Sequence, residues 1–492
     1  MNKKYTNYIY VGALLYIVYH IATLVYSPIP WFDEETYANI TESFLKNGRF
    51  YEEARNISWA TSKLDLAYGP VYFMLQGLVT TIFGFSQFTF RMTNLMCGLG
   101  CLFLLYKVCR QLKFSDGVTL LAMLLIAFDP QFNQFLHSGR MDFVALFFSL
   151  SGYLLFMQMK DADGKFSVRS VGVGLLLALA FMTNPRILFS FAFYGCYAVY
   201  ELVGKRLKNI VPVLIKYATV GVAFAALYSI WVYVEFGSLK NYVSEVYTNS
   251  PIMKEHVGAT TVGFRINYNM AMHLLSLLVF ALMVMARKVK EQANLVMLTA
   301  PGIVVFLGMV SGGIAGRYYG LVVPFTTLLV VGGMVNAYHN APGKWLTKAL
   351  LAAFVAVFCF KAVYIFATLD QRSPKKYDAI IASHIPQHAT VAGDFAYYYI
   401  IKNHGWTYQC LEENGRMEEK IAYYQTYKYD FIIINKGNPS LSQYEQTFLK
   451  DRYKLVATIE DQQNGTFHNI LSRLPLRISE GYGGYIYQYI GQ

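Results

Sequence analysis

The sequence predicts a polytopic α-helical membrane protein that ends in a separate α/β domain. Of its 492 residues, 55% are hydrophobic and 15% are charged, and the mean hydropathy is +0.33. A soluble chain of this length carries more charge. Many apolar stretches approach the roughly 20 residues that cross a bilayer. The stretch after residue 368 is polar and strand-like, so we divide the chain into a membrane domain, 1–368, and a terminal domain, 369–492.

The apolar stretches predict about eleven membrane spans. The first is too long and too aromatic for a cleaved signal peptide, so we expect it to remain as an anchor. Segment 70–85 is apolar but short and contains Gly77 and Gly84, so we expect it to lie at the membrane surface. The expected spans are 8–26, 89–109, 117–130, 141–159, 171–184, 186–203, 211–236, 268–286, 294–311, 318–338 and 349–368.

The basic residues predict the orientation of these spans. If the short apolar segment does not cross, the Lys and Arg residues in 3–4, 107–113, 160–169 and 287–290 fall on one side. The positive-inside rule makes that side cytoplasmic. We therefore expect a cytoplasmic N-terminus, with the first outer loop, 27–88, and the terminal domain on the opposite face. The compact chain is typical of a bacterial inner (plasma) membrane protein with a periplasmic or extracellular terminal domain, and membrane lipids are its expected surroundings.

Charge and motifs exclude some partners. The net charge is +12, but no basic stretch lies in a nucleic-acid reading module, so we expect no nucleic-acid partner. The terminal domain shows no GxGxxG or P-loop motif, so nucleotide binding has no support. Strands are expected at 390–394, 431–435 and 454–459, with helix-like sequence after the first two. The tyrosines of 482–489 are expected to pack in the domain rather than to line a carbohydrate site.

Three acidic residues, Asp33, Glu34 and Glu35, stand together just after the first span. Ionised carboxylates at the membrane boundary are energetically costly unless they are solvated, form ion pairs or serve a function. Residues at helical spacing follow them up to Gly48, which predicts an amphipathic helix on the membrane surface. Spacing alone favours a structural role, in which Asp33 caps this helix.

Further charges lie at the same outer boundary of the expected membrane domain. Each isolated arginine at a span end is commonly a headgroup anchor. Several that converge near one carboxylate would form a phosphate site, because guanidinium groups match phosphate oxygens. The charged residues at this boundary include Arg91, Arg140, Asp142, Arg186 and Arg317.

Taken together and in order, these elements resemble the GT-C superfamily of lipid-phosphate-sugar-dependent glycosyltransferases. The similarity is greatest to the branch of protein O-mannosyltransferases and lipid A aminoarabinose transferases, and it covers roughly residues 1–340. The matching marks are Asp33-Glu34 with Tyr37-Ala38, Gly69-Pro70-Val71-Tyr72 in place of a Pro-Pro-Leu-Tyr element, the Arg91 segment, Arg140-Met141-Asp142 and Arg317-Tyr318.

The resemblance implies inverting transfer of a hexosyl or pentosyl group from a polyprenyl-phosphate donor to a lipid, glycan or protein acceptor. Transfer would take place at the outer membrane face. In this family the first acid of the Asp-Glu pair is the general base, which places that role on Asp33, with Glu34 beside it to orient the acceptor or hold a metal. The expected donor-binding residues are Tyr68, Arg91, Arg140, Asp142, Arg317 and Tyr318.

One departure from the family pattern leaves open whether a divalent metal is a cofactor. Aminoarabinose transferases carry a Glu-Lys pair before the Pro-Pro element, where this chain has Ala67 and Tyr68. A phosphate-binding lysine and one metal ligand of that family are therefore missing. A divalent metal remains an open cofactor, with Glu34 and His256 as weak candidate ligands.

Two other functions compete with the transferase. A transporter or flippase of lipid-linked saccharide would place ionisable residues near the middle of the membrane, and Lys361 is the clearest such residue. A structural protein that binds a partner through its outer domain is the other alternative.

Overall fold

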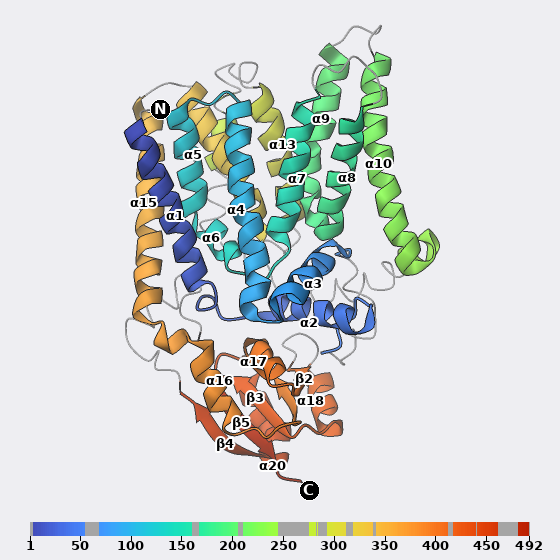
Figure 1. Cartoon of the computed structure of the whole chain (residues 1–492), viewed down its shortest axis with the longest axis vertical. Helices are drawn as coiled ribbons and strands as arrows, with labels where there is room; N and C mark the ends of the chain where they lie inside the picture. Colours follow the sequence, from blue (N-terminus) through green and yellow to red (C-terminus); the bar gives the residue numbers. More distant parts are fainter. Residues whose placement is uncertain are drawn as a thin grey trace.

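The computed structural model is a bundle of long helices with an α/β domain at one end (Figure 1). We call the end of the bundle next to this domain the domain-side end. The N-terminal helix begins at the opposite end. The structure describes residues 3–54, 68–159, 167–204, 210–244, 275–281, 283, 293–310, 318–337, 341–411, 417–438, 440–460 and 481–491.

The bundle helices run along the long axis of the molecule, and α14 lies at their centre, since every residue of α14 is buried. Helix α7 packs against α4 and α8, and α8 packs against α10. The described helices of the bundle are α1 (Lys3–Thr23), α4 (Gln87–Gln111), α5 (Asp116–Phe128), α7 (Asp142–Met157), α8 (Val168–Thr183), α9 (Leu188–Gly204), α10 (Ile210–Phe236), α13 (Ala293–Val310), α14 (Tyr319–Val331) and α15 (Ala341–Ala367).

The expected spans coincide with these helices, with bounds that differ by eight residues or fewer. The exception is the expected span 268–286, most of which lies outside the described residues. Four of the described helices are long and apolar enough to cross a membrane by length and composition: α4, the helix at 185–203, α10 and the 347–367 part of α15. The chain is thus an integral membrane protein, and the number of crossings stays a prediction.

Short helices gather at the domain-side end. Helices α2 and α3 lie across the bundle axis there, between the long helices and the terminal domain (Figure 1). Helix α3 covers the segment that we expected at the membrane surface, and its Met74, Leu78 and Ile82 side chains are exposed. The short elements of the membrane domain are α2 (Phe32–Asn47), α3 (Val71–Phe83), α6 (Pro130–Leu136), η2 (Pro185–Ile187) and η5 (Gly332–Ala337).

Helix α2 ends where the sequence predicted but begins differently. Gly48 adopts a left-handed conformation (φ 67°) and its N–H donates to the Phe44 carbonyl at 2.9 Å, which closes the helix. Trp31, and not Asp33, is the residue that precedes the first turn. The capping role of Asp33 is therefore wrong. Most of α2 is also buried, because it lies between α3 and α4 of the membrane domain and α17 of the terminal domain, so α2 is not a simple surface helix.

The terminal domain is built on a five-stranded mixed sheet with the order β2-β1-β3-β5-β4. Strand β1 pairs in parallel with β2 and β3, whereas β5 is antiparallel to β3 and β4. The strands are β1 (Thr390–Gly393), β2 (Thr407–Cys410), β3 (Phe431–Asn435), β4 (Tyr453–Ile459) and β5 (Gly484–Tyr489). The helices are η6 (Asp370–Arg372), α16 (Pro374–Ala382), η7 (Phe395–Tyr397), α17 (Tyr398–Asn403), α18 (Met417–Thr426), α19 (Leu441–Tyr444), η8 (Glu445–Leu449) and α20 (Lys450–Arg452).

The three expected strands are β1, β3 and β4, while β2 and β5 were not expected. Strand β2 is only four residues long, too short for an alternating pattern to be visible. Strand β5 is the tyrosine-rich tail, and the Tyr487 side chain is buried in the core of the domain. The tail therefore packs, as the sequence favoured.

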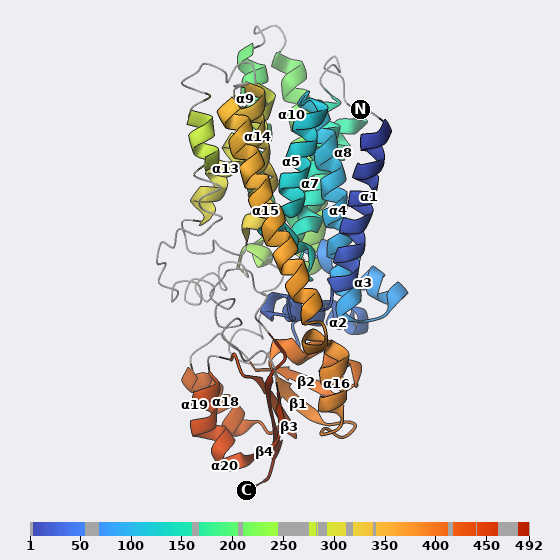
Figure 2. The ribbon, with the colours of Figure 1, turned by 90° about the vertical axis from the view of Figure 1, so that its left-hand side faces the viewer.

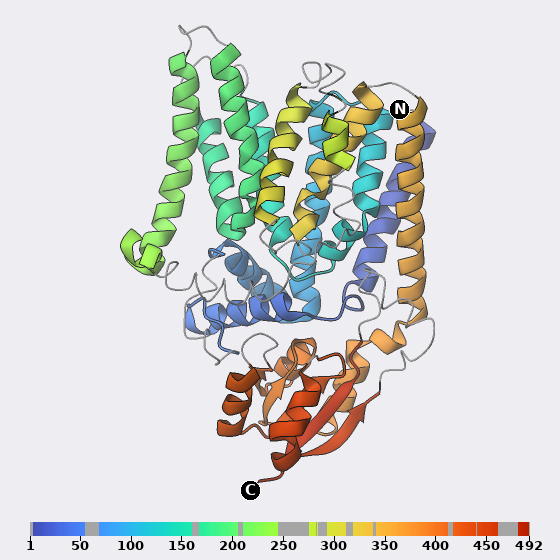
Figure 3. The ribbon, with the colours of Figure 1, turned by 180° about the vertical axis from the view of Figure 1, so that it is seen from behind.

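The terminal domain is docked on the first loop of the membrane domain, as two further views show (Figures 2 and 3). Lys402 of α17 forms an ion pair with Glu42 of α2 at 2.8 Å. Phe90 of α4 lies in the same buried cluster as Tyr399 of α17, and their ring centroids are 6.0 Å apart. The backbone N–H of Cys410 donates to the Ala54 carbonyl at 2.8 Å. Apolar, ionic and backbone contacts thus hold the domain against α2.

Candidate functional site

Most of the expected site residues come from separate segments that meet at the domain-side end of the bundle. Asp33 and Glu34 lie in the first turn of α2, and Arg91 lies in the second turn of α4. Arg140 and Asp142 stand where α6 leads into α7. Tyr68 precedes α3 and Tyr318 precedes α14. Arg317 and His256 lie outside the described residues.

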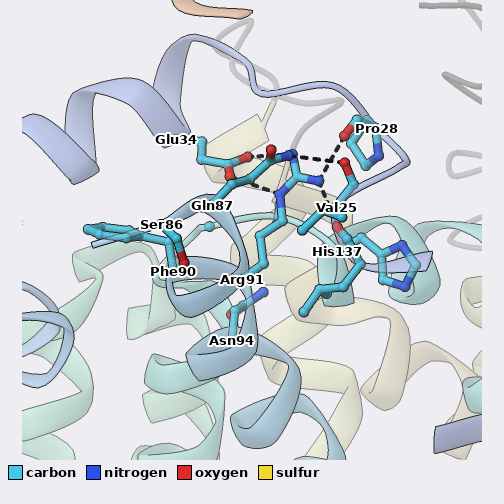
Figure 4. Close-up of polar contacts among 12 residues, drawn as sticks. Val25, Pro28, Glu34, Ser86, Gln87, Phe90, Arg91, Asn94 and His137 are labelled. Atoms are coloured by element: carbon cyan, nitrogen blue, oxygen red, sulfur yellow. Dashed lines mark hydrogen bonds and ion pairs between the residues drawn. The ribbon is translucent and has the colours of Figure 1, made fainter. Parts of the chain in front are cut away.

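Glu34 and Arg91 form a two-pronged ion pair inside the protein (Figure 4). Arg91 Nε donates to Glu34 Oε1 at 2.8 Å and Nη2 donates to Oε2 at 2.9 Å. Both side chains are completely buried. This fork geometry is the strongest arrangement for an arginine and a carboxylate. It joins the start of α2 to the start of α4.

The remaining hydrogen-bonding capacity of Arg91 goes to the chain after α1. Its Nη1 donates to the carbonyl oxygens of Leu24 and Pro28, each at 2.8 Å. With its amide oriented to suit its neighbours, Gln87 also accepts from Nη1 at 3.0 Å. The Arg91 guanidinium is thus enclosed by protein acceptors. This arrangement argues against the phosphate-binding role expected for Arg91.

A second buried network surrounds Arg140, whose side chain is 2% exposed. Arg140 Nη1 pairs with Asp33 Oδ2, and its Nε donates to Asp142 Oδ2 at 2.5 Å. Asp142 Oδ1 accepts from Asn184 Nδ2 at 3.0 Å. Two carboxylates therefore share one guanidinium. The Asp33 side chain keeps 11% of its surface exposed, whereas that of Glu34 keeps none.

Aromatic rings surround the Arg140 cation. Its guanidinium carbon lies 5.1 Å from the ring centroids of Trp31 and Tyr318 and 5.6 Å from that of Phe135. Cations are attracted to ring faces at such distances. Tyr37 lies close by on α2. Burial, followed by its neighbours Tyr68 and Asp33, raises the pKa of Tyr37 above its ordinary value, so its phenol is neutral.

Arg186 is the site residue that sequence reasoning missed. It lies in η2, directly after Asn184-Pro185, and its side chain is half-buried. Its Nη1 donates to the Tyr68 hydroxyl at 2.6 Å, and its guanidinium lies 3.9 Å from the Tyr318 ring centroid. Within the described part of the chain, Tyr68 is the only side chain to which this guanidinium donates. The sequence did contain a signal for Arg186, because Arg186 is one of the arginines at the outer boundary. On its own, however, Arg186 resembled an isolated anchor for lipid headgroups.

The backbone before Arg140 is fixed by its surroundings. The Tyr72 hydroxyl donates to the Gly139 carbonyl at 2.8 Å. A Cβ at Gly139 would lie 2.8 Å from Glu34 Cγ, so only glycine fits between α2 and the Arg140 segment. The two networks, Glu34–Arg91 and Asp33–Arg140–Asp142, are therefore in contact through Gly139.

The described residues do not favour the divalent metal that the sequence left open as a cofactor. Among them, no group of three or more His, Cys, Asp and Glu side chains could hold a metal ion. Glu34, an expected candidate ligand, gives both oxygens to the Arg91 cation, which argues against its binding a second cation. The other candidate, His256, lies outside the described residues.

Comparisons with known proteins bear on the fold. The family described as dolichyl-phosphate-mannose-protein mannosyltransferase matches residues 67–232. Two solved structures of ArnT from Cupriavidus metallidurans superpose on almost the whole chain. The structure bound to undecaprenyl phosphate has 11% identity and a TM-score of 0.56 and covers 98% of both chains. The apo structure has 12% identity and a TM-score of 0.57 and covers 99% of this chain and 98% of ArnT. No curated protein matches the sequence at a significant level.

The fold is that of the two ArnT structures. The resemblance drawn from the sequence marks is confirmed by these matches. The match to the mannosyltransferase family spans Tyr68, Arg91, Arg140, Asp142 and Arg186, which belong to the two networks and to the Arg186 contact. Asp33 lies before the matched range.

Proposed function

We propose that this protein is an inverting glycosyltransferase that moves a sugar from a polyprenyl-phosphate donor to an acceptor hydroxyl or phosphate. The GT-C fold and the mannosyltransferase match support the reaction class. In the proposal, Asp33 is the general base, and Arg186 with Tyr68 binds the donor phosphate. Transfer takes place at the domain-side end, on the outer face of a bacterial inner membrane.

One observation carries this proposal: the arginine that pairs with Asp33 and a second arginine, whose guanidinium donates to a single side chain among the described residues, lie over one aromatic ring. Arg140, the partner of Asp33, and Arg186 both lie over the ring of Tyr318, at 5.1 and 3.9 Å. Arg186 has donors that no described side chain uses, unlike the enclosed Arg91. The site therefore offers a proton acceptor beside a phosphate-binding group, which is what displacement of a lipid phosphate requires.

The proposed reaction is a single displacement. Asp33 accepts the proton of the acceptor hydroxyl while the acceptor oxygen forms a bond to the anomeric carbon. The bond between that carbon and the phosphate oxygen breaks, and the electron pair leaves with the lipid phosphate. Arg186 and the Tyr68 hydroxyl stabilise the charge that develops on this oxygen.

The remaining expected residues receive different roles in this proposal. Glu34 and Arg91 fix the start of α2 and so hold the neighbouring Asp33 in place. Arg140 and Asp142 orient Asp33 from the other side. Tyr318 supplies the ring on which both arginines lie. A donor contact by Arg317 stays a prediction.

The test is a transfer assay with the purified full-length protein in detergent. Radiolabelled polyprenyl-phosphate sugars from a small panel are the donors, and native membrane extract supplies the acceptors. We expect label to move to an acceptor with the wild-type protein and not with Asp33→Asn. Parallel reactions with a chelator test whether transfer depends on a divalent metal, and we expect the rate of transfer to be unchanged.

The thermal unfolding midpoint of Asp33→Asn serves as the folding control. No transfer from any donor, together with donor binding that Asp33→Asn leaves unchanged, would favour a transporter of lipid-linked saccharide. Transfer at the wild-type rate by a well-folded Asp33→Asn variant would contradict the role of Asp33 as the general base.

A further inference from the structure

Asn184 occupies the junction between the two halves of the proposed site. It is 1% exposed and lies between the end of α8 and the turn η2. Its Nδ2 donates to Asp142 Oδ1 at 3.0 Å, and its Oδ1 accepts from the backbone N–H of Arg186 at 3.1 Å. One amide thus contacts the carboxylate network on one side and the phosphate-binding arginine on the other.

The contacts form a continuous chain. Asp33 pairs with Arg140, Arg140 with Asp142, Asp142 with Asn184, and Asn184 with the backbone of Arg186. Arg140, Asp142 and Asn184 are all buried, and the Asp33 side chain is 11% exposed. Buried hydrogen bonds of this kind fix geometry strongly, because an unsatisfied partner is costly in a low-dielectric interior.

The chemistry of this position favours asparagine. The residue must donate to a carboxylate and accept from a backbone N–H at the same time. A carboxamide does both, whereas a carboxylate lacks the donor and alanine lacks both groups. Asn184 is also a cap, since its side chain accepts from the turn that follows. Pro185 then limits the backbone of that turn.

We propose that Asn184 is a positioning residue that ties Arg186 to the Asp33–Arg140–Asp142 network. It touches neither the donor nor the acceptor and acts through Arg186. Its bond to the Arg186 N–H sets where η2 presents the guanidinium to Tyr68 and Tyr318. Its bond to Asp142 holds that turn at a fixed distance from the base. This inference rests on the proposed function, because it gives Arg186 the donor phosphate.

The test measures binding of undecaprenyl phosphate, in detergent micelles, to the purified full-length protein. Arg186→Ala should weaken binding strongly. Asn184→Ala should weaken it about tenfold, the equivalent of one ordinary hydrogen bond. Asn184→Asp keeps the acceptor for the Arg186 N–H but loses the donor to Asp142 and places two buried carboxylates together, so it should weaken binding by about tenfold or more.

The double variant, with Asn184→Ala and Arg186→Ala, separates positioning from general stability. If Asn184 acts through Arg186, the double variant should bind no more weakly than Arg186→Ala alone. The effects of substitutions at residues in contact do not add. Thr183→Val is the matched control. Thr183 is fully buried, and among the described residues its hydroxyl donates only to the Leu179 carbonyl of its own helix, so this variant should bind like wild type.

The outcomes distinguish the inference from the function on which it rests. No binding by wild type, or unchanged binding by Arg186→Ala, would overturn the proposed donor site. Three outcomes would overturn the inference alone, given normal wild-type binding and weak Arg186→Ala binding. These are wild-type affinity in Asn184→Ala, wild-type affinity in Asn184→Asp, and effects of Asn184→Ala and Arg186→Ala that add in full.

Discussion

Two acidic neighbours in the first turn of α2 have different surroundings and therefore different roles. Glu34 is completely buried, and Arg91 has Glu34 as its carboxylate partner. Asp33 is partly exposed and shares Arg140 with a second carboxylate, Asp142. Removing the charge of Glu34 leaves a buried cation without compensation. Removing the charge of Asp33 leaves a neutral Arg140–Asp142 pair.

Glu34→Gln should therefore destabilise the fold, while Asp33→Asn should abolish transfer and leave the fold intact. Breaking a buried ion pair from one side costs about 3–5 kcal/mol. The measurement is the thermal unfolding midpoint of both variants in the same detergent. A combined variant, Glu34→Gln with Arg91→Met, removes both charges and should recover part of the loss. Equal midpoints for Glu34→Gln and wild type would contradict this account.

Sequence reasoning identified the site residues better than their partners. The boundary position of Arg140, Asp142 and Arg186 was visible, because hydropathy locates span ends. The pairing of Glu34 with Arg91 was not, because 57 residues separate them and no local pattern records such a contact. Arg186 was read singly, and only the fold brings it to Tyr68 and Tyr318.

At the scale of elements, the docking of the terminal domain on α2 depends partly on one ion pair. Glu42 pairs with Lys402 of α17 and also receives a hydrogen bond from the Tyr398 hydroxyl at 3.2 Å. Burial raises the pKa of Glu42, but the charges and hydrogen bonds of Lys402 and Lys46 outweigh this effect. The pKa of Glu42 is therefore below its ordinary value.

A group with a lowered pKa stabilises the folded arrangement at neutral pH and loses that contribution as the pH falls through the lowered pKa. We expect the contact between α2 and the terminal domain to hold at neutral pH and to loosen in acid, below the ordinary pKa of a glutamate. Hydrogen exchange of α17 against pH would follow this change. Glu42→Gln should show faster exchange at neutral pH and little further change in acid. An identical pH profile for wild type and Glu42→Gln would contradict the expectation.

A close backbone contact joins α3 to α8. A Cβ at Gly69 would lie 2.5 Å from the Met182 carbonyl oxygen, so Gly69→Ala must move one of the two segments. Overpacking of this kind costs about 1–3 kcal/mol, so the unfolding midpoint should fall. Because Tyr68 is adjacent, donor binding should weaken as well. Gly12→Ala is the matched control, since nothing lies within 4 Å of a Cβ there and its midpoint should not fall. A midpoint for Gly69→Ala no lower than that of Gly12→Ala would show that the contact is not tight.

Hydropathy predicted the long helices well because each must be apolar over a length that matches the bilayer. It predicted the terminal sheet in part. The apolar run of β3 was visible, but β2 is too short to show a pattern. The burial of α2 was not predictable, because its cover comes from residues almost 360 positions later, such as Lys402 and Tyr398.

At the scale of the whole molecule, the structure places the start of α1 and the terminal domain at opposite ends of the bundle (Figure 1). The distribution of basic loops predicts that these ends face opposite sides of the membrane, with the terminal domain outside. The fold is thus compatible with the predicted orientation.

Cysteine labelling in intact cells tests this orientation. Lys428 is exposed on the terminal domain, and Arg110 is about half exposed at the opposite end of the bundle. A membrane-impermeant maleimide should label Lys428→Cys and not Arg110→Cys, and lysis should allow both to react. The wild-type chain, with its own six cysteines, gives the background. Labelling of Arg110→Cys and not of Lys428→Cys in intact cells would show that the orientation is opposite to the predicted one.

The central claim is that a carboxylate for proton transfer and an arginine for the donor phosphate meet in one site. The most direct measurement determines, for the same preparations, undecaprenyl phosphate affinity and the rate of sugar transfer from a polyprenyl-phosphate donor. Asp33→Asn should bind like wild type and transfer at least about a hundredfold more slowly, since a general base contributes about 10²–10⁴ in rate. Arg186→Ala should bind more weakly. Transfer by a folded Asp33→Asn at the wild-type rate, or wild-type binding by Arg186→Ala, would contradict the account.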